Sequence, residues 1–328
     1  MLTSLCSVAA LVTLLQAPPT PEPEAGDSFA AIRARTVRDS TDARLWLLMG
    51  RAYLELGAEA HGPGHRSSED SAWSRAVLDT AEAALTRAAA LAGPPGATAV
   101  GDSARVLRVG AWTVRSWLAW ESAGDASTAD GGVLALGPLP MDLRIPPVLE
   151  ELGENLLRAC PVAGVLLTTV DADFYGAWFM RFARGLRPDL LVVPLSAWRS
   201  DPVLRTRVAT DLKLGGRHHA GSADALLGEL VRRRPVCVSM AFERPPDTRP
   251  RIRWEIRPLV WVAGQPGKGA PVPPRDFVFG ALRLALDGQD PWAEQALAAY
   301  VRAARTTPAL CEPMATFKVA GDVPACRR

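Results

Sequence analysis

Two aspartates separated by one residue, Asp171 and Asp173, follow the apolar run 163–170 near the middle of this 328-residue chain. If the run is a strand of an open parallel sheet, the pair stands at its carboxyl end, where such sheets bind ligands. An Asp-x-Asp pair can hold a divalent metal together with the phosphates of a nucleotide sugar. The two carboxylates are therefore the first candidates for chemistry in this sequence.

The same pair also suits a structural role. Asp171 can cap the helix that the following residues predict, and Asp173 in its first turn would interact well with the helix dipole. No third acidic ligand is obvious nearby, so we favour capping and assign neither a catalytic residue nor a metal ligand. Thr169 and Ser196 end adjacent apolar runs and could line a pocket, but both types are also common in strands and turns. The candidate ligand-binding residues are Thr169, Asp171, Asp173 and Ser196.

Other motifs that could carry chemistry fail on their spacing. The glycine-rich stretch 263–270 lacks phosphate-loop spacing, has no Ser or Thr after Lys268 and runs into prolines. The histidines form two pairs in glycine-rich loops without a matching Cys or His cluster, which favours solvated loop residues over metal ligands. They are His61, His65, His218 and His219. No Gly-x-Ser-x-Gly elbow exists, so the sequence indicates no catalytic set and no cofactor.

Composition places the chain among ordinary globular proteins. Hydrophobic residues make up 48% of the sequence and charged residues 22%, which argues against extensive disorder. The formal net charge of +2 gives no electrostatic case for a nucleic-acid partner. The length is sufficient for two domains that each bury a core.

The N-terminal segment, residues 1–17, is the main indication of cellular location. Its apolar stretch Leu2–Leu15 has the length of a signal-peptide core and is too short to span a bilayer comfortably. The absence of Lys and Arg before it, and the prolines after Ala17, leave a buried cytoplasmic helix as the alternative. We expect an extracytoplasmic protein, periplasmic or secreted, in which residues 18–27 form a Pro/Glu linker. An uncleaved segment would keep the protein near the membrane.

The cysteines are Cys6, Cys160, Cys237, Cys311 and Cys326. None forms a Cys-x-x-Cys pair, which excludes zinc-ribbon and thioredoxin-type motifs. Cys160 and Cys237 lie at or in apolar runs, where cysteine is usually an inert core residue. In an exported protein, Cys311 and Cys326 could form a disulfide within the irregular tail that we expect over residues 311–328.

Residues 28–128 are expected to form an all-α module. The spacing of Trp46, Met49, Gly50 and Tyr53 resembles the first helix of a tetratricopeptide repeat, and residues 79–95 fit the partner helix. A third helix is predicted over about 103–123. Such repeats normally need at least three copies to stand alone, so the module should lean on the domain that follows.

Residues 129–310 show a different pattern, in which apolar runs alternate with helical segments. This alternation predicts a three-layer α/β domain with a mostly parallel, Rossmann-like sheet, closed by two C-terminal helices. The first apolar run lies within 131–140, and the others are 163–170, 188–196 and 235–242. The alternating stretch 252–264 suits a single edge strand.

Residues 150–263 resemble the soluble C-terminal domain of a bacterial membrane family described as protein O-mannosyltransferase-like and of unknown function. The matching positions are Val170–Asp173, Trp178–Phe179 and Gly185–Asp189, in the family's order. The family's Gly-Asp-Asn-Asp reads Val-Asp-Ala-Asp here, and its multi-span region, which would carry any glycosyl transfer, is absent. The resemblance therefore implies an extracytoplasmic accessory domain and gives no support for catalysis.

These observations favour a non-catalytic, exported interaction or scaffold protein, accessory to a membrane glycosyltransferase-like system. It would bind a protein partner through its helical repeat module. The alternative is a ligand-binding or sugar-handling enzyme whose site lies at the strand ends around Asp171 and Ser196.

Overall fold

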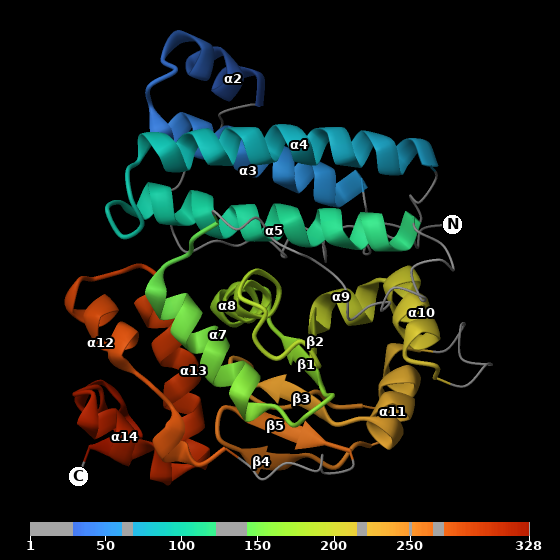
Figure 1. Ribbon diagram of the computed structural model, residues 1–328, viewed down its shortest axis with the longest axis vertical. Helices are drawn as coiled ribbons and strands as arrows, with labels where there is room; N and C mark the ends of the chain where they lie inside the picture. Colours follow the sequence, from blue (N-terminus) through green and yellow to red (C-terminus); the bar gives the residue numbers. More distant parts are fainter. Residues whose placement is uncertain are drawn as a thin grey trace, which may run out of the picture. The chain divides into compact units, whose positions relative to one another are not determined.

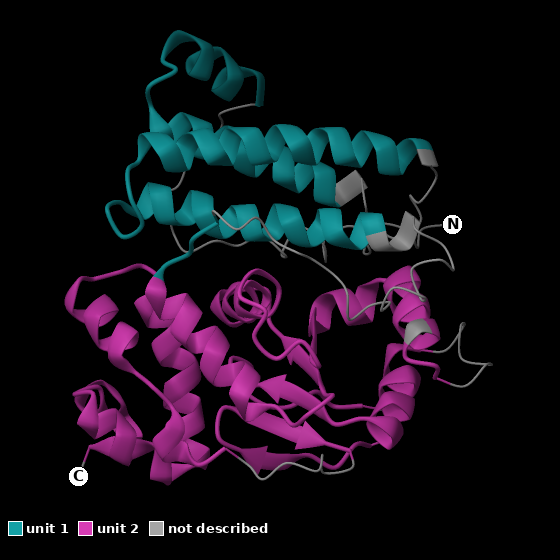
Figure 2. Ribbon diagram, viewed as in Figure 1, with its two compact units in different colours: residues 1–124, 137–146 teal, residues 125–136, 147–328 magenta. Residues whose placement is uncertain are grey.

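The computed structural model describes residues 29–60, 68–122, 143–214, 222–248, 251–264 and 272–327. These residues belong to two compact units, shown in separate colours in Figure 2. Unit 1 takes in the chain up to Gly124 and residues 137–146, and unit 2 takes in residues 125–136 and everything from Pro147 onward. The apolar run within 131–140 and all four histidines lie outside the described residues.

Unit 1 consists of helices in the part that the structure describes. They are α2 (Phe29–Arg38), α3 (Ala43–Ala60), α4 (Ser68–Leu91) and α5 (Ala99–Ser122). Buried leucines and alanines of α3, α4 and α5 form one apolar core, with Leu54, Leu78 and Leu107 at most 1% exposed. A second, smaller cluster joins Ile32 of α2 to Met49 of α3 and Ala84 of α4. The predicted helices are confirmed, and α4 begins earlier than the repeat pattern indicates.

Two glycines allow α3 and α4 to pack closely. A Cβ atom on Gly50 would lie 2.7 Å from the Leu85 side chain, and one on Gly57 would lie 2.9 Å from the Leu78 side chain. The two glycines are seven residues apart and therefore share a face of α3. Because glycine has no side chain, leucines of α4 fill the space above these two positions. This is the close packing that the Trp-x-x-Met-Gly pattern predicts.

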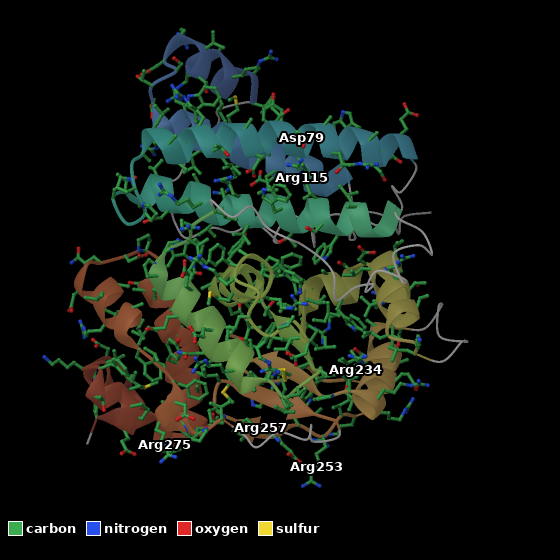
Figure 3. The ribbon with its side chains drawn as sticks, in the orientation of Figure 1. Asp79, Arg115, Arg234, Arg253, Arg257 and Arg275 are labelled. Carbon is green, nitrogen blue, oxygen red and sulfur yellow. A yellow bond between two sulfur atoms is a disulfide. The ribbon has the colours of Figure 1, made fainter. Side chains whose placement is uncertain are left out.

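Ion pairs join α4 to α5 in addition to the apolar core. Arg115 of α5 pairs with Asp79 of α4, and Figure 3 shows these two side chains facing each other between the helices. Arg108 pairs with Glu82 at 2.8 Å, and both side chains are largely buried. Alternating arginine and acidic positions thus fix how the two helices align along their length.

Unit 2 contains a five-stranded sheet of short strands (Figure 1). The strands are β1 (Val165–Thr168), β2 (Leu191–Pro194), β3 (Val236–Ser239), β4 (Glu255–Arg257) and β5 (Val260–Ala263), in the order β2-β1-β3-β5-β4. β1 pairs in parallel with β2 and β3, with Val165 opposite both Leu191 and Val236. β3 pairs with β5, and β5 with β4, in antiparallel fashion. Three of the predicted apolar runs are therefore confirmed as strands.

The predicted fold class is wrong. The described residues are mostly helical, and their sheet is small and mixed rather than a mostly parallel, Rossmann-like sheet within three layers. The physical reason lies after β3, where the described chain forms no crossover helix and returns through β4. A parallel neighbour needs such a crossover, so β5 can join β3 only in the antiparallel direction. The expected single edge strand is instead a β4–β5 hairpin that turns at Pro258 and Leu259, where Leu259 has a φ of 68°.

Helices account for most of the rest of unit 2. They are α7 (Pro147–Ala159), α8 (Ala172–Trp178), α9 (Leu195–Ser200), α10 (Pro202–Asp211), α11 (Ala223–Arg233), α12 (Gly280–Asp287), α13 (Ala293–Thr306) and α14 (Cys311–Thr316). A π-helical turn, η3 (Phe179–Ala183), extends α8, and 3-10 turns lie at η4 (Pro274–Asp276), η5 (Pro308–Leu310), η6 (Ala320–Asp322) and η7 (Pro324–Cys326). The C-terminal stretch expected to be irregular thus contains α14 and short turns. No described helix is long and apolar enough to cross a membrane.

Helix α8, which begins directly after Asp171, packs backbone to backbone against α7. A Cβ atom on Gly153 of α7 would overlap the backbone of Gly176 in α8, and one on Gly176 would overlap the Leu149 carbonyl. The two glycines let the helices cross at a distance that no larger residue permits. This crossing fixes the position of the segment that carries the two aspartates.

Two disulfides lie in unit 2. One joins Cys311 to Cys326, the pair that the sequence favours, and ties α14 to the last 3-10 turn. The other joins Cys160 to Cys237 across 77 residues and links the end of α7 to β3. The prediction that Cys160 and Cys237 are inert core thiols is therefore wrong, although both are buried. The bond between Cys160 and Cys237 depends on a tertiary contact that the sequence alone does not predict.

Candidate functional site

Three parallel strands end at the same edge of the sheet and position the candidate residues. Thr168, the last residue of β1, lies opposite Pro194, the last residue of β2. Ser239 ends β3 on the other side of β1, one residue after Val238, which pairs with Leu167. The segment from Thr169 to Asp173 leaves this edge and enters α8, so the two aspartates follow the carboxyl end of a parallel strand, as the sequence predicted.

Asp173 is fully buried and its carboxylate is occupied by hydrogen bonds. It accepts from the Thr169 backbone N–H at 3.0 Å, from the Thr169 hydroxyl and from the Phe174 N–H at 3.0 Å. The Ser239 hydroxyl also hydrogen-bonds it, which connects β3 to the β1–α8 turn. Burial raises the pKa of Asp173, and these hydrogen bonds oppose that rise. Asp173 therefore organises the strand ends from within the fold.

Asp171 stands at the start of α8, yet its side chain makes no capping hydrogen bond. The capping hypothesis for this carboxylate is wrong. Its backbone carbonyl accepts from the Phe174 and Tyr175 N–H groups, and the Phe174 N–H also donates to Asp173. The first-turn donors are therefore taken by other oxygens, and Asp173 supplies the local side-chain acceptor instead.

The Asp171 carboxyl is consequently the uncommitted acidic group at this edge. It is half-buried, and the helix cap provides it with no donor. Burial, together with the neighbouring charge of Asp173, raises the pKa of Asp171 from 3.8 to about 6. A carboxyl group with that pKa exchanges its proton near neutral pH and can accept a hydrogen bond from a ligand, or donate one.

The four predicted residues do not all come together. Thr169 joins the aspartates, because its hydroxyl donates to Asp173 and accepts from the Asp171 N–H at 3.2 Å. Ser196 lies in the first turn of α9, and no hydrogen bond between described residues links it to the other three. Its hydroxyl oxygen is buried without a partner in the described structure, as is that of Thr168.

Two residues of this region were missed by sequence reasoning. Ser239 contacts Asp173, and its place as the hydroxyl residue within the apolar run 235–242 is a signal that could have suggested it. Arg302 of α13 donates to the carbonyls of Met240 and Ala241, each at 2.7 Å. Burial lowers the pKa of Arg302, and the charges of Glu243 and Asp173 oppose this. Arg302 lies more than sixty residues after Met240 and Ala241 in the chain, so only the tertiary fold brings it to the end of β3.

No family model, curated protein or solved structure matches this chain. The function is therefore inferred from the sequence and from the geometry of the residues that the structure describes. Within the described ranges, no group of three His, Cys, Asp or Glu side chains could hold a metal ion.

The Gly185–Asp189 stretch, one of the motifs behind the family resemblance, has a structural role here. Arg187 forms a two-pronged ion pair with Asp189, at 3.0 and 2.9 Å, and donates to the carbonyls of Leu157 and Cys160. Asp189 in turn accepts from the Ala163 N–H at 2.8 Å. The motif therefore ties the end of α7 to the segments that lead into β1 and β2, and so helps to position these two strands.

Proposed function

We propose that this protein is an exported, non-catalytic interaction protein whose helical unit binds a protein partner. The observation that carries the proposal is the glycine-mediated packing of α3 on α4, with α5 added as a third layer. Tetratricopeptide-like modules stack helices in this way and expose extended faces to partners. The order of motifs over residues 150–263 supports a place beside a membrane glycosyltransferase-like system.

The two disulfides support an extracytoplasmic location. Together they pair Cys160, Cys237, Cys311 and Cys326, which are all the cysteines after residue 6. Structural disulfides form and persist in oxidising compartments and are rare in the cytosol of mesophiles. This agrees with the interpretation of residues 1–17 as an export signal.

An exposed stripe along α4 is the surface that we propose for the partner. Trp73, Thr80 and Arg87 are exposed and recur every seven residues, so they share one face of the helix. Trp73 is 48% exposed, and tryptophan often anchors protein interfaces.

Site-specific photo-crosslinking tests this surface. A photoreactive amino acid at each of the three positions, in cells that export the protein, should give an adduct of one discrete mass. The same amino acid in place of Leu284 on α12, which is 74% exposed, is the matched control and should give no such adduct. Equal adducts at all four positions, or none at the three α4 positions, would contradict the proposal.

Asp171 favours a second candidate function, the binding of a ligand at the strand ends. The supporting observation is a half-buried carboxyl group that the fold leaves without a capping bond. A thermal melt with and without Mg²⁺ or Mn²⁺ tests whether the strand-end carboxylates bind a cation, because a bound metal raises the melting temperature by mass action. A rise that disappears in Asp171→Asn would favour the ligand site over a purely structural strand end.

A further inference from the structure

A pocket of about 620 Å³ lies in the connection between β3 and β4. It is lined by Pro245, Pro246, Asp247, Thr248, Arg251, Ile252, Arg253 and Trp254. The Ile252 N–H donates to the buried Thr248 hydroxyl at 3.2 Å, which holds the two walls together. None of these residues belongs to the Asp171 site, and the volume lies in the range of small-molecule sites.

The lining combines cationic donors with apolar walls. Arg251 and Arg253 are exposed, and neither guanidinium forms an ion pair or hydrogen bond with a residue that the structure describes. Asp247 lines the same pocket and pairs with neither. Figure 3 shows Arg253 beside the sheet edge near Arg257, directed away from the ribbon. The pocket thus presents two uncommitted positive groups to whatever enters it.

Several other arginines of unit 2 pair with carboxylates. Arg283 pairs with both Asp287 and Asp322, Arg187 pairs with Asp189, and Arg233 pairs with Glu229. The two pocket arginines form no such pair with a carboxylate that the structure describes, although Asp247 lines the same pocket.

Trp254 contributes an aromatic side chain to the lining. Its indole N–H is buried and has no hydrogen-bond partner in the described structure. The signal of this N–H therefore reports on changes around the ring when a ligand packs beside it. Pro245, Pro246 and Ile252 provide apolar surface on which a ring can pack.

We propose that this pocket binds an organic anion in which an oxyanion group, carboxylate or phosphate, is attached to an apolar ring. Arg251 and Arg253 would hold the oxyanion through charge-assisted hydrogen bonds, for which the planar guanidinium is well suited. The ring would lie against the prolines and Trp254. This binding activity is independent of the partner proposed for unit 1.

The indole N–H signal of Trp254 in a ¹⁵N–¹H correlation spectrum is the readout, assigned as the signal lost in Trp254→Phe. Benzoate and phenyl phosphate are the probes, and benzyl alcohol and benzylamine are the neutral and cationic controls with the same ring. Both anions should shift the Trp254 signal in a saturable manner, and both controls should leave it in place. A larger response to one anion identifies the oxyanion, and inorganic phosphate alone should bind more weakly than phenyl phosphate.

Substitution of the arginines completes the test. Arg251→Gln and Arg253→Gln should each weaken anion binding by about tenfold or more, because each removes a charge-assisted hydrogen bond. Arg275→Gln is the matched control, since Arg275 is an exposed arginine outside the pocket. Both pocket arginines are exposed, so unchanged melting temperatures should show that the variants fold. Anion binding that persists in the double variant, or equal shifts with benzyl alcohol and benzoate, would overturn the proposal.

Discussion

Asp171 and Asp173 show how two identical side chains two residues apart acquire opposite roles. Asp173 accepts three local hydrogen bonds and a fourth from Ser239, so its carboxylate belongs to the fold. Asp171 is half-buried without a capping bond, so its charge is a net cost to folding. The difference follows from which oxygens reach the first-turn N–H groups of α8.

The first prediction concerns Asp171 and pH. Its carboxyl binds a proton more tightly when folded, since its pKa rises from 3.8 to about 6. Its contribution to stability is therefore lost as pH rises through about 4 to 6. Asp171→Asn should stabilise the protein at pH 7 by about 1–2 kcal/mol, after allowance for solvent screening of a partly exposed group.

Thermal melts of wild type and Asp171→Asn between pH 4 and pH 8 check this prediction. The difference in melting temperature should be largest at neutral pH and should shrink toward pH 4. Asp173→Ala is the contrasting variant, which should destabilise by about 3 kcal/mol because it leaves buried N–H donors unsatisfied. An Asp171→Asn variant that is no more stable than wild type at pH 7 would contradict the assigned cost of the Asp171 charge.

At the scale of secondary-structure elements, glycines decide how closely the helices approach. The α7–α8 crossing at Gly153 and Gly176 brings two backbones into contact, whereas the α3–α4 crossing opposes glycine to leucine side chains. A leucine side chain can shift by changing rotamer, but a helix backbone can move only with its whole helix. The two crossings should therefore differ in their tolerance of an added methyl group.

The second prediction compares glycine-to-alanine substitutions. Gly153→Ala should cost about 3 kcal/mol or more, because the new Cβ atom overlaps the Gly176 backbone. Gly50→Ala should cost about 1–3 kcal/mol, since Leu85 can move. Gly321→Ala is the control, because nothing lies within 4 Å of its added Cβ atom. Denaturant unfolding of the three variants measures the costs, and equal costs at Gly153 and Gly321 would refute the assigned contact.

At the scale of the whole molecule, the cross-links carry the third prediction. Peptide mapping of the exported protein without reductant should find Cys160 joined to Cys237 and Cys311 joined to Cys326. In the chain-entropy model a loop of 15 residues is worth about 3 kcal/mol, and the 77-residue separation about 4–5 kcal/mol. The double variant Cys160→Ser, Cys237→Ser should therefore lose more stability than Cys311→Ser, Cys326→Ser. Free thiols at all four positions would remove both the pairing and its support for export.

The fourth prediction concerns the N-terminal segment. Fusion of roughly the first thirty residues to a reporter that is active only outside the cytoplasm should give a signal. The same fusion with Leu11→Arg and Leu14→Arg, which interrupts the apolar stretch, is the control and should be silent. A silent unmodified fusion would indicate that Leu2–Leu15 is a structural helix.

The sequence by itself determined the local elements of this protein. Helical spacing of apolar residues predicted α3, α7, α11 and α13, and apolar runs predicted β1, β2 and β3. The sequence also predicted that Thr169, Asp171 and Asp173 lie together at the end of one strand. These inferences succeeded because backbone hydrogen bonding and side-chain periodicity operate over a few residues.

The tertiary structure alone decided the contacts between residues far apart in the chain. The antiparallel entry of β5, the Cys160–Cys237 bond and the approach of Ser239 to Asp173 are such contacts. The mostly helical character of the chain, which overturned the expected α/β class, likewise followed from how short the strands are and how they pair. Periodicity indicates that a segment is a strand and which residues are apolar, but it does not indicate the neighbour or its direction, because these depend on connections and packing across the whole unit.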